Sequence, residues 1–371
     1  MDTIIGGTRR VSVGYALDDL ALVPSRRTRD VELVDVSWSF DAYTFDLPVI
    51  GAPIDAVTSP QSAGILGGLG ALGVLNLEGL WTRYVDPTEV LAEIAGLTPG
   101  PEATMRLQQL YAEPVKAELI GQRIDELKAA AGFAAGSLTP QKVERWHHAA
   151  LEAGLDLLMI HGVAVTAQHV GLPDRKPLDL RSFTARYDIP VIAGNVSSAK
   201  TALHLMRTGA VGVVVGGGAD SASTTPAALG INVPLATAIA EVASARSRYL
   251  DESGRTVHVI AAGGLTTGGD LAKAIACGAD AVMLGRALAS ADEAPGRGAC
   301  WGVSAAHHEL PRGRYFKVDP LGPMSVILEG PAHRDDGTVN LVGGLRRAMA
   351  VTGYESLARF REAELIVRAG R

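Results

Sequence analysis

Cysteine is scarce in this 371-residue chain, which contains only Cys277 and Cys300. Two cysteines are too few for a disulfide framework, and their separation does not match a paired metal-binding spacing. We therefore expect a protein of the reducing cytoplasm with no structural metal. No run of about 18 uncharged apolar residues occurs, and the N-terminus lacks a basic segment followed by an apolar core. The sequence predicts neither a membrane span nor an export signal.

Aromatic residues and positive charge are also sparse. Phe, Trp and Tyr together make up 5% of the chain, and its formal net charge is -6 with acidic and basic residues interspersed. A basic field that could hold a phosphate backbone is therefore missing, as are the aromatic platforms on which bases stack. We expect no nucleic-acid partner.

Apolar residues and glycine are abundant, at 47% and 43 residues respectively. Three segments share one pattern, in which a helix stops at a glycine, a tight turn follows and an apolar strand begins: Ala153–His161, Thr208–Gly216 and Cys277–Gly285. Continuous apolar strands of this kind indicate a parallel sheet covered by helices. Further strands are expected at Leu47–Gly51, Ala71–Asn76, Phe133–Gly136, Pro190–Asn195 and His258–Gly264.

Eight strands favour a closed α/β barrel, the (β/α)8 or TIM-barrel fold, over an open doubly wound sheet. The stretch 84–130 has an amphipathic helical pattern broken near Thr98–Pro101, and we interpret it as a helical insertion. Residues 297–371 form a C-terminal extension. The whole chain, 1–371, is expected to be one domain.

Glycine-rich loops follow the last two expected strands. Gly263 and Gly264 end one strand, and Gly285 with Arg286 ends the other. In such barrels phosphate commonly binds there, because glycine lets backbone N–H groups approach an anion, a following helix N-terminus adds its dipole and an arginine adds a charged fork. The alternative is that these glycines only make tight turns.

Polar residues and glycines at other strand ends are further candidates. Gly216 and Gly218 form a loop that has no specific motif on its own. Asp55 and Asn195 close apolar strands at the expected catalytic face, where they could contact a ligand or cap the following helix.

Several motifs together resemble the IMP dehydrogenase/GMP reductase family over nearly the whole chain. The closest resemblance is to the divergent actinobacterial IMP dehydrogenase-related subgroup, which lacks the paired regulatory CBS domains. The matching segments are Leu17–Pro24, Pro48–Thr58, Ala193–Val196, Gly269–Ala274, Gly278–Gly285, Glu293–Gly296 and Gly343–Arg346.

The resemblance implies an oxidoreductase of purine metabolism and GMP biosynthesis that binds a purine nucleoside monophosphate and uses NAD or NADP. It implies attack of a cysteine thiolate on the purine, hydride transfer and hydrolysis of the adduct. It also implies a monovalent cation on a loop that is altered here, and a homotetramer or octamer.

The chain departs from the family pattern at four places. Alignment puts Ser223 where the cysteine belongs, His161 where an aspartate lies near the nicotinamide, and Ala262 where an aspartate holds the ribose. The flap after the last strand is reduced to roughly 297–311. An unactivated serine hydroxyl is a much poorer nucleophile than a thiol.

Two segments near the shortened flap invite comparison with the family. Arg314-Tyr315-Phe316 resembles an Arg-Tyr pair of the family's flap, and we interpret this match as coincidence. Cys300 could supply a displaced thiol, whereas Cys277 is expected to be a small buried filler.

We therefore expect catalytic roles for Ser223 and Thr225 and a cofactor side formed by Asp55 and His161. His161 could instead be a structural histidine. A pseudoenzyme that binds a purine nucleotide is the alternative to an active oxidoreductase, and a barrel that binds FMN is a third possibility. The expected substrate-binding residues are Asn195, Gly216, Gly218, Gly263, Gly264, Gly285 and Arg286.

Overall fold

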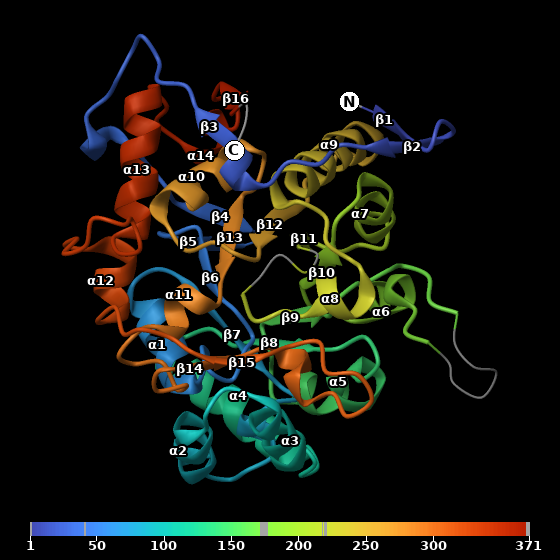
Figure 1. Cartoon of the computed structure of the whole chain (residues 1–371). Coiled ribbons are helices and arrows are strands. Elements are labelled where there is room, and N and C mark those ends of the chain that lie inside the picture. Colours follow the sequence, from blue (N-terminus) through green and yellow to red (C-terminus); the bar gives the residue numbers. More distant parts are fainter. Residues whose placement is uncertain (1, 41, 171–176, 217, 219–220, 369–371) are drawn as a thin grey trace.

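In the computed structural model, eight parallel strands close into a barrel whose neighbours follow chain order around the ring (Figure 1). The structure describes residues 2–40, 42–170, 177–216, 218 and 221–368. The barrel strands are β6 (Val49–Gly51), β7 (Leu72–Asn76), β8 (Ala135–Leu138), β9 (Leu157–His161), β10 (Val191–Val196), β11 (Gly212–Val215), β12 (His258–Ala262) and β13 (Ala281–Leu284).

All eight strands expected from the sequence are present, and the (β/α)8 barrel is confirmed. Almost every residue of these strands is buried, as expected for strands covered by helices on one face and packed against each other on the other. The third strand begins two residues later than expected. Phe133 does not join the ladder, because its ring packs edge-on against Tyr43 with centroids 4.5 Å apart.

Helices surround the barrel and pack pairwise, α1 on α4, α7 on α9 and α10 on α13. The glycines expected to stop helices do so, since Gly154, Gly209 and Gly278 have positive φ angles that side chains rarely adopt. The surrounding helices are α1 (Pro60–Gly68), α4 (Ala117–Ala131), α5 (Val143–Glu152), α6 (Leu180–Arg186), α7 (Ala199–Met206), α9 (Leu235–Ser253), α10 (Gly268–Ala276) and α13 (Leu341–Thr352).

One cluster of aromatic residues lies at the amino-terminal end of the barrel. A hairpin of β4 (Trp38–Phe40) and β5 (Tyr43–Phe45) buries Trp38 and Phe40, whose rings contact the edge of His258 at the start of β12. The Trp38 indole N–H donates to the Leu47 carbonyl at 3.0 Å. This cluster closes the end of the barrel opposite the expected active site.

Three helices occupy the stretch 84–130, with the break near residue 98 where the sequence placed it: α2 (Thr88–Gly96), α3 (Pro101–Leu110) and α4. Helices α2 and α3 support a hairpin formed by β14 (Ala299–Trp301) and β15 (Tyr315–Lys317). We call residues 299–317 the covering hairpin. The Tyr315 hydroxyl donates to the carbonyls of Ile94 and Leu97 at 2.7 and 3.0 Å, so the hairpin is fixed to the end of α2.

The C-terminal segment returns to the start of the chain, where β16 (Leu365–Val367) pairs antiparallel with β3 (Leu20–Leu22). No described helix is both long and apolar enough to cross a membrane. The remaining elements are β1 (Asp2–Ile5), β2 (Arg9–Ser12), α8 (Thr225–Leu229), α11 (Arg286–Ala289), α12 (Met324–Glu329), α14 (Leu357–Phe360) and four 3-10 turns, Leu17–Asp19, Val31–Leu33, Leu80–Thr82 and Val303–Ala306.

Candidate functional site

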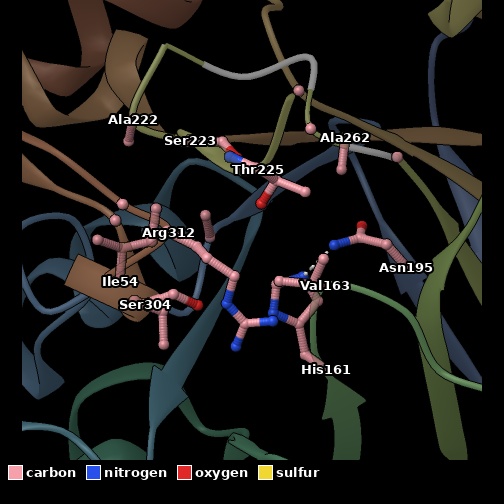
Figure 2. A pocket seen from close by; sticks show the side chains of 18 of the residues that line it. Ile54, His161, Val163, Asn195, Ala222, Ser223, Thr225, Ala262, Ser304 and Arg312 are labelled. Carbon is pink, nitrogen blue, oxygen red and sulfur yellow. Dashed lines mark hydrogen bonds between the residues drawn. The ribbon is translucent and has the colours of Figure 1, made fainter. Parts of the chain in front are cut away.

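A cavity of about 390 Å³ lies at the carboxyl-terminal ends of the barrel strands, the end at which barrel enzymes place their active sites (Figure 2). Its walls come from the loops after six of the strands and from the covering hairpin. Except for Asp55, every site residue expected from the sequence lines this cavity: Asn195, Gly216, Gly218, Ser223, Thr225, Gly263, Gly264, Gly285, Arg286 and His161.

Three glycines form what we call the glycine cradle, Gly263, Gly264 and Gly285. The φ angles of Gly263 and Gly264 are +112° and +70°, a region that a side chain would strain. Within the described part of the chain, no hydrogen bond engages the three amides. They lie where an anion bound at the ends of β12 and β13 would meet them.

The N-terminus of α10 contributes less to this cradle than the sequence suggested. Thr267 caps the helix by accepting from the Asp270 amide at 3.1 Å, while the Asp270 carboxylate accepts from the amides of Thr266 and Thr267. The Gly268 amide donates to the Gly337 carbonyl. Because these donors are engaged within the chain, an anion would depend on the cradle amides and on Arg286.

Arg286 extends from the cradle side of the mouth. Its guanidinium carbon lies 5.8 Å from the centroid of the Phe316 ring, so a residue of the covering hairpin supports it by a cation–π contact. Both residues line the cavity. The side chain is thereby held near the loop after β13.

On the other side, Asn195 and His161 form a hydrogen-bonded pair at the ends of β10 and β9. The Asn195 side-chain amide donates to His161 Nε2 at 3.2 Å and to the Gly162 carbonyl at 3.0 Å. Accepting at Nε2 places the ring proton on Nδ1. Burial lowers the pKa of His161 to about 4, so the ring is neutral at pH 7. Gly216 leaves room for this pair, since a Cβ there would lie 2.8 Å from Asn195 Oδ1.

Ser223 lines the cavity but has no base beside it among the described residues. Its hydroxyl accepts from the Thr225 amide at 3.1 Å, and its backbone forms a bridge to Gly313 of the covering hairpin. Thr225 begins the short helix α8. The altered loop that would hold a monovalent cation includes residues 217, 219 and 220, which lie outside the described residues.

Asp55 lies beneath the cavity instead of lining it, and its side chain is 2% exposed. The Tyr111 hydroxyl and the Leu80 amide both donate to its Oδ2, and the Trp301 indole N–H donates to Tyr111 at 2.8 Å. Burial raises the pKa of Asp55 to about 6. In this structure the carboxyl group links the barrel to the insertion and to the covering hairpin.

The two cysteines differ in their surroundings. Cys300 is buried in β14 and lines the cavity. Cys277 follows α10, and burial raises the pKa of its thiol to about 11, consistent with a filler rather than a nucleophile. No group of three or more metal-ligating side chains occurs in the parts of the chain that the structure describes.

Among the cavity residues that escaped the sequence analysis are Arg312 and Ser304. Both lie on the covering hairpin, and Figure 2 shows the Arg312 side chain extending into the cavity toward His161. The position of Arg312 just ahead of Arg314 and Tyr315 was the available signal.

These observations define a class: a (β/α)8 barrel with a cavity at its mouth, lined by arginine side chains and by glycines whose amides have no acceptor among the described residues. The chain belongs to the IMP dehydrogenase / GMP reductase domain family, whose model matches residues 14–371. The sequence-based resemblance to this family is thereby confirmed.

Similar proteins fall into two groups. An uncharacterized oxidoreductase of Mycolicibacterium smegmatis is 47% identical over 98% of this chain and 99% of its own length. The inosine-5'-monophosphate dehydrogenase of Haemophilus influenzae is 32% identical over 65% of this chain and 50% of its own. A crystal structure of an IMP dehydrogenase/GMP reductase-like protein from Corynebacterium glutamicum has a TM-score of 0.93 at 44% identity, covering 99% of this chain and 98% of that one.

Proposed function

We propose that this chain binds a purine nucleoside 5′-monophosphate, with its phosphate on the glycine cradle and Arg286 and its base beside Asn195. The observation that carries the proposal is the set of three cradle amides, which have no acceptor among the described residues and lie at the edge of a cavity of about 390 Å³. Oriented backbone amides of this kind bind phosphate in many barrels. Family membership supports a purine as the base.

NAD or NADP is the proposed second ligand, on the side of the cavity formed by His161. The residues present are compatible with it, because His161, Asn195, Thr139 and Gln141 offer neutral donors and acceptors. A bound nicotinamide cofactor would supply hydride transfer. The chain's own contribution is to orient both ligands and, through the covering hairpin, to exclude water.

The reaction class is oxidoreduction, which the family and its uncharacterized oxidoreductase members support. One observation favours a second candidate, a catalytically silent nucleotide-binding protein. Ser223 has no base beside it among the described residues, and its hydroxyl accepts a hydrogen bond from Thr225. A serine in that setting would not form the covalent adduct.

Calorimetric titration with IMP, GMP, XMP, NAD and NADP, together with the near-ultraviolet absorbance of NADH, tests both candidates. Binding of a monophosphate with turnover supports the oxidoreductase, and binding without turnover supports the silent binder. Failure of every purine monophosphate to bind would contradict the proposal. We also propose a homotetramer or octamer, as in the family, which light scattering after size-exclusion chromatography tests.

A further inference from the structure

We propose that Arg312 forms a second anion subsite in the cavity, separate from the glycine cradle, so that the cavity accepts oxyanions at two opposite sides. The first observation concerns the guanidinium group of this side chain. Its Nε is buried without a hydrogen bond, and neither a hydrogen bond nor an ion pair engages the side chain among the described residues. Each N–H of a guanidinium is a donor that calls for an acceptor when water is excluded.

Three other arginines that are buried or partly buried differ from Arg312, because each donates to a carboxylate. Arg123 donates to the carboxylate of Glu126 and to the Trp81 carbonyl, and Arg246 donates to Asp280. Arg361 also has an unbonded Nε, but its Nη2 donates to Asp280. Arg312 alone of these four lines the cavity, and the described lining contains no Asp or Glu. A bound ligand would supply the acceptor that these described residues do not.

The backbone of Arg312 is held on both sides, which fixes the direction of the side chain. Its amide donates to the Ser304 carbonyl at 3.1 Å, and its carbonyl accepts from the Thr224 amide at 2.6 Å. The following residue, Gly313, pairs with Ser223 and leaves no room for a Cβ against Ala305. Because the backbone is already held, an anion that binds here has to order only the side-chain torsions of Arg312.

The subsite lies across the mouth from the cradle. Figure 2 shows Arg312 pointing toward His161, at the end of β9. In the ring of eight strands β9 is four positions from β13, which carries Gly285, so the two ends face each other. An oxyanion at Arg312 is therefore a second group, distinct from a phosphate in the cradle. Ser304, on the same hairpin, adds a hydroxyl donor to the cavity wall.

The chemistry selects a planar or tetrahedral oxyanion, a carboxylate or a phosphate, because the guanidinium fork matches either in a bidentate manner. The ligand set that satisfies both sides is a monophosphate in the cradle together with a second molecule that carries its own oxyanion. That identity rests on the proposed function, whereas the subsite itself does not.

The test is phenylglyoxal modification of the full-length chain, followed by mass spectrometry of the peptides that carry Arg312, Arg286 and exposed Arg255. Inorganic phosphate and acetate are the probes. We expect one of them to slow modification of Arg312 at least about tenfold, with Arg255 unaffected as internal control. Stronger protection by phosphate identifies a phosphate group, and stronger protection by acetate identifies a carboxylate.

Separation from the cradle is tested by repeating the measurement on Arg286→Ala and on Gly264→Val. We expect protection of Arg312 to persist in both variants. Protection in the wild type that disappears in both variants would show a single shared site, and absence of protection by either anion would show that Arg312 is no receptor. Either result overturns the proposal. Since the probes contain no nucleotide, these results are independent of whether a purine monophosphate binds.

Discussion

The two sides of the barrel mouth are built from different parts of the chain. The cradle side uses backbone amides of Gly263, Gly264 and Gly285, which lie directly after two neighbouring strands. The opposite side uses side chains, His161 and Asn195 from strand ends and Arg312 from the covering hairpin. A backbone site is set by local conformation, whereas a side-chain site depends on packing between distant segments.

The strongest test of this comparison is Gly264→Val on the cradle side. A β-branched residue at a φ of +70° forces the loop to change, and the amides then no longer converge on the anion. We expect binding of IMP to weaken at least about 100-fold, since loss of two charge-assisted hydrogen bonds costs about 3 kcal/mol or more. Calorimetric titration measures this.

Gly269→Ala is the matched control, because a Cβ at that position meets only Thr267 Oγ1, at 3.7 Å. The control should bind IMP as the wild type does. Unchanged affinity in Gly264→Val would mean that backbone amides do not hold the phosphate, and the comparison of the two sides would fail.

The two sides of the mouth also differ in how well the sequence predicts them. The strands and the cradle were predictable, because apolar runs and glycine loops are local patterns. Arg312 was not, since it reaches the cavity only when the covering hairpin packs on the insertion, for example through Tyr315 and the carbonyls of α2. The position of Asp55 beneath the cavity was not predictable either, because its carboxylate accepts a hydrogen bond from Tyr111, which is distant in the sequence.

On the side of the mouth that is built from side chains, His161 should make the free energy of unfolding decrease as the pH falls. Its folded-state pKa of about 4 lies below the ordinary value of 6.5, so the unfolded chain takes up the proton first. The stabilising contribution is complete above about pH 6.5 and is lost as pH falls toward 4, amounting to about 3 kcal/mol. Urea unfolding of the wild type and of His161→Asn at pH 7.5 and 4.5 measures this. The free energy of unfolding should decrease less between the two pH values in the variant, a decrease that we call the acid loss. An equal loss would contradict a buried neutral ring.

Asp55, beneath the cavity, should have the opposite effect on the pH dependence of stability from His161, which lines the cavity. Its folded-state pKa of about 6 lies above the ordinary 3.8, so its contribution is complete below about pH 3.8 and is lost as pH rises through 6. Asp55→Asn should therefore increase the acid loss between pH 7.5 and 4.5 by about 2–3 kcal/mol. The same unfolding series measures it, and a decreased loss would show that burial does not govern this carboxyl group.

Tyr315→Phe tests whether packing on the insertion positions the side-chain half of the mouth. The change leaves the carbonyls of Ile94 and Leu97 without the hydroxyl donor, at a cost of about 1–3 kcal/mol. We expect faster amide exchange across residues 299–317 and weaker anion protection of Arg312, with the cradle unaffected. Tyr249→Phe is the control, because Tyr249 is a buried residue whose hydroxyl makes no hydrogen bond among the described residues. Unchanged exchange across the hairpin would mean that other contacts hold it.

Ser223→Ala should have the smallest effect. Ser223 is bridged to Gly313 of the covering hairpin, but it belongs neither to the glycine cradle nor to the side chains on the opposite side of the mouth. Its hydroxyl accepts from the Thr225 amide, so its loss should cost stability of about 1 kcal/mol, as for other capping hydroxyls, and change IMP affinity less than about threefold. Titration and NADH absorbance, with Ser221→Ala as a neighbouring control, measure both. A variant that binds IMP normally but loses turnover would contradict this expectation and assign Ser223 a catalytic role. A proton acceptor would then have to approach Ser223 when the ligands bind, because none lies beside it among the described residues.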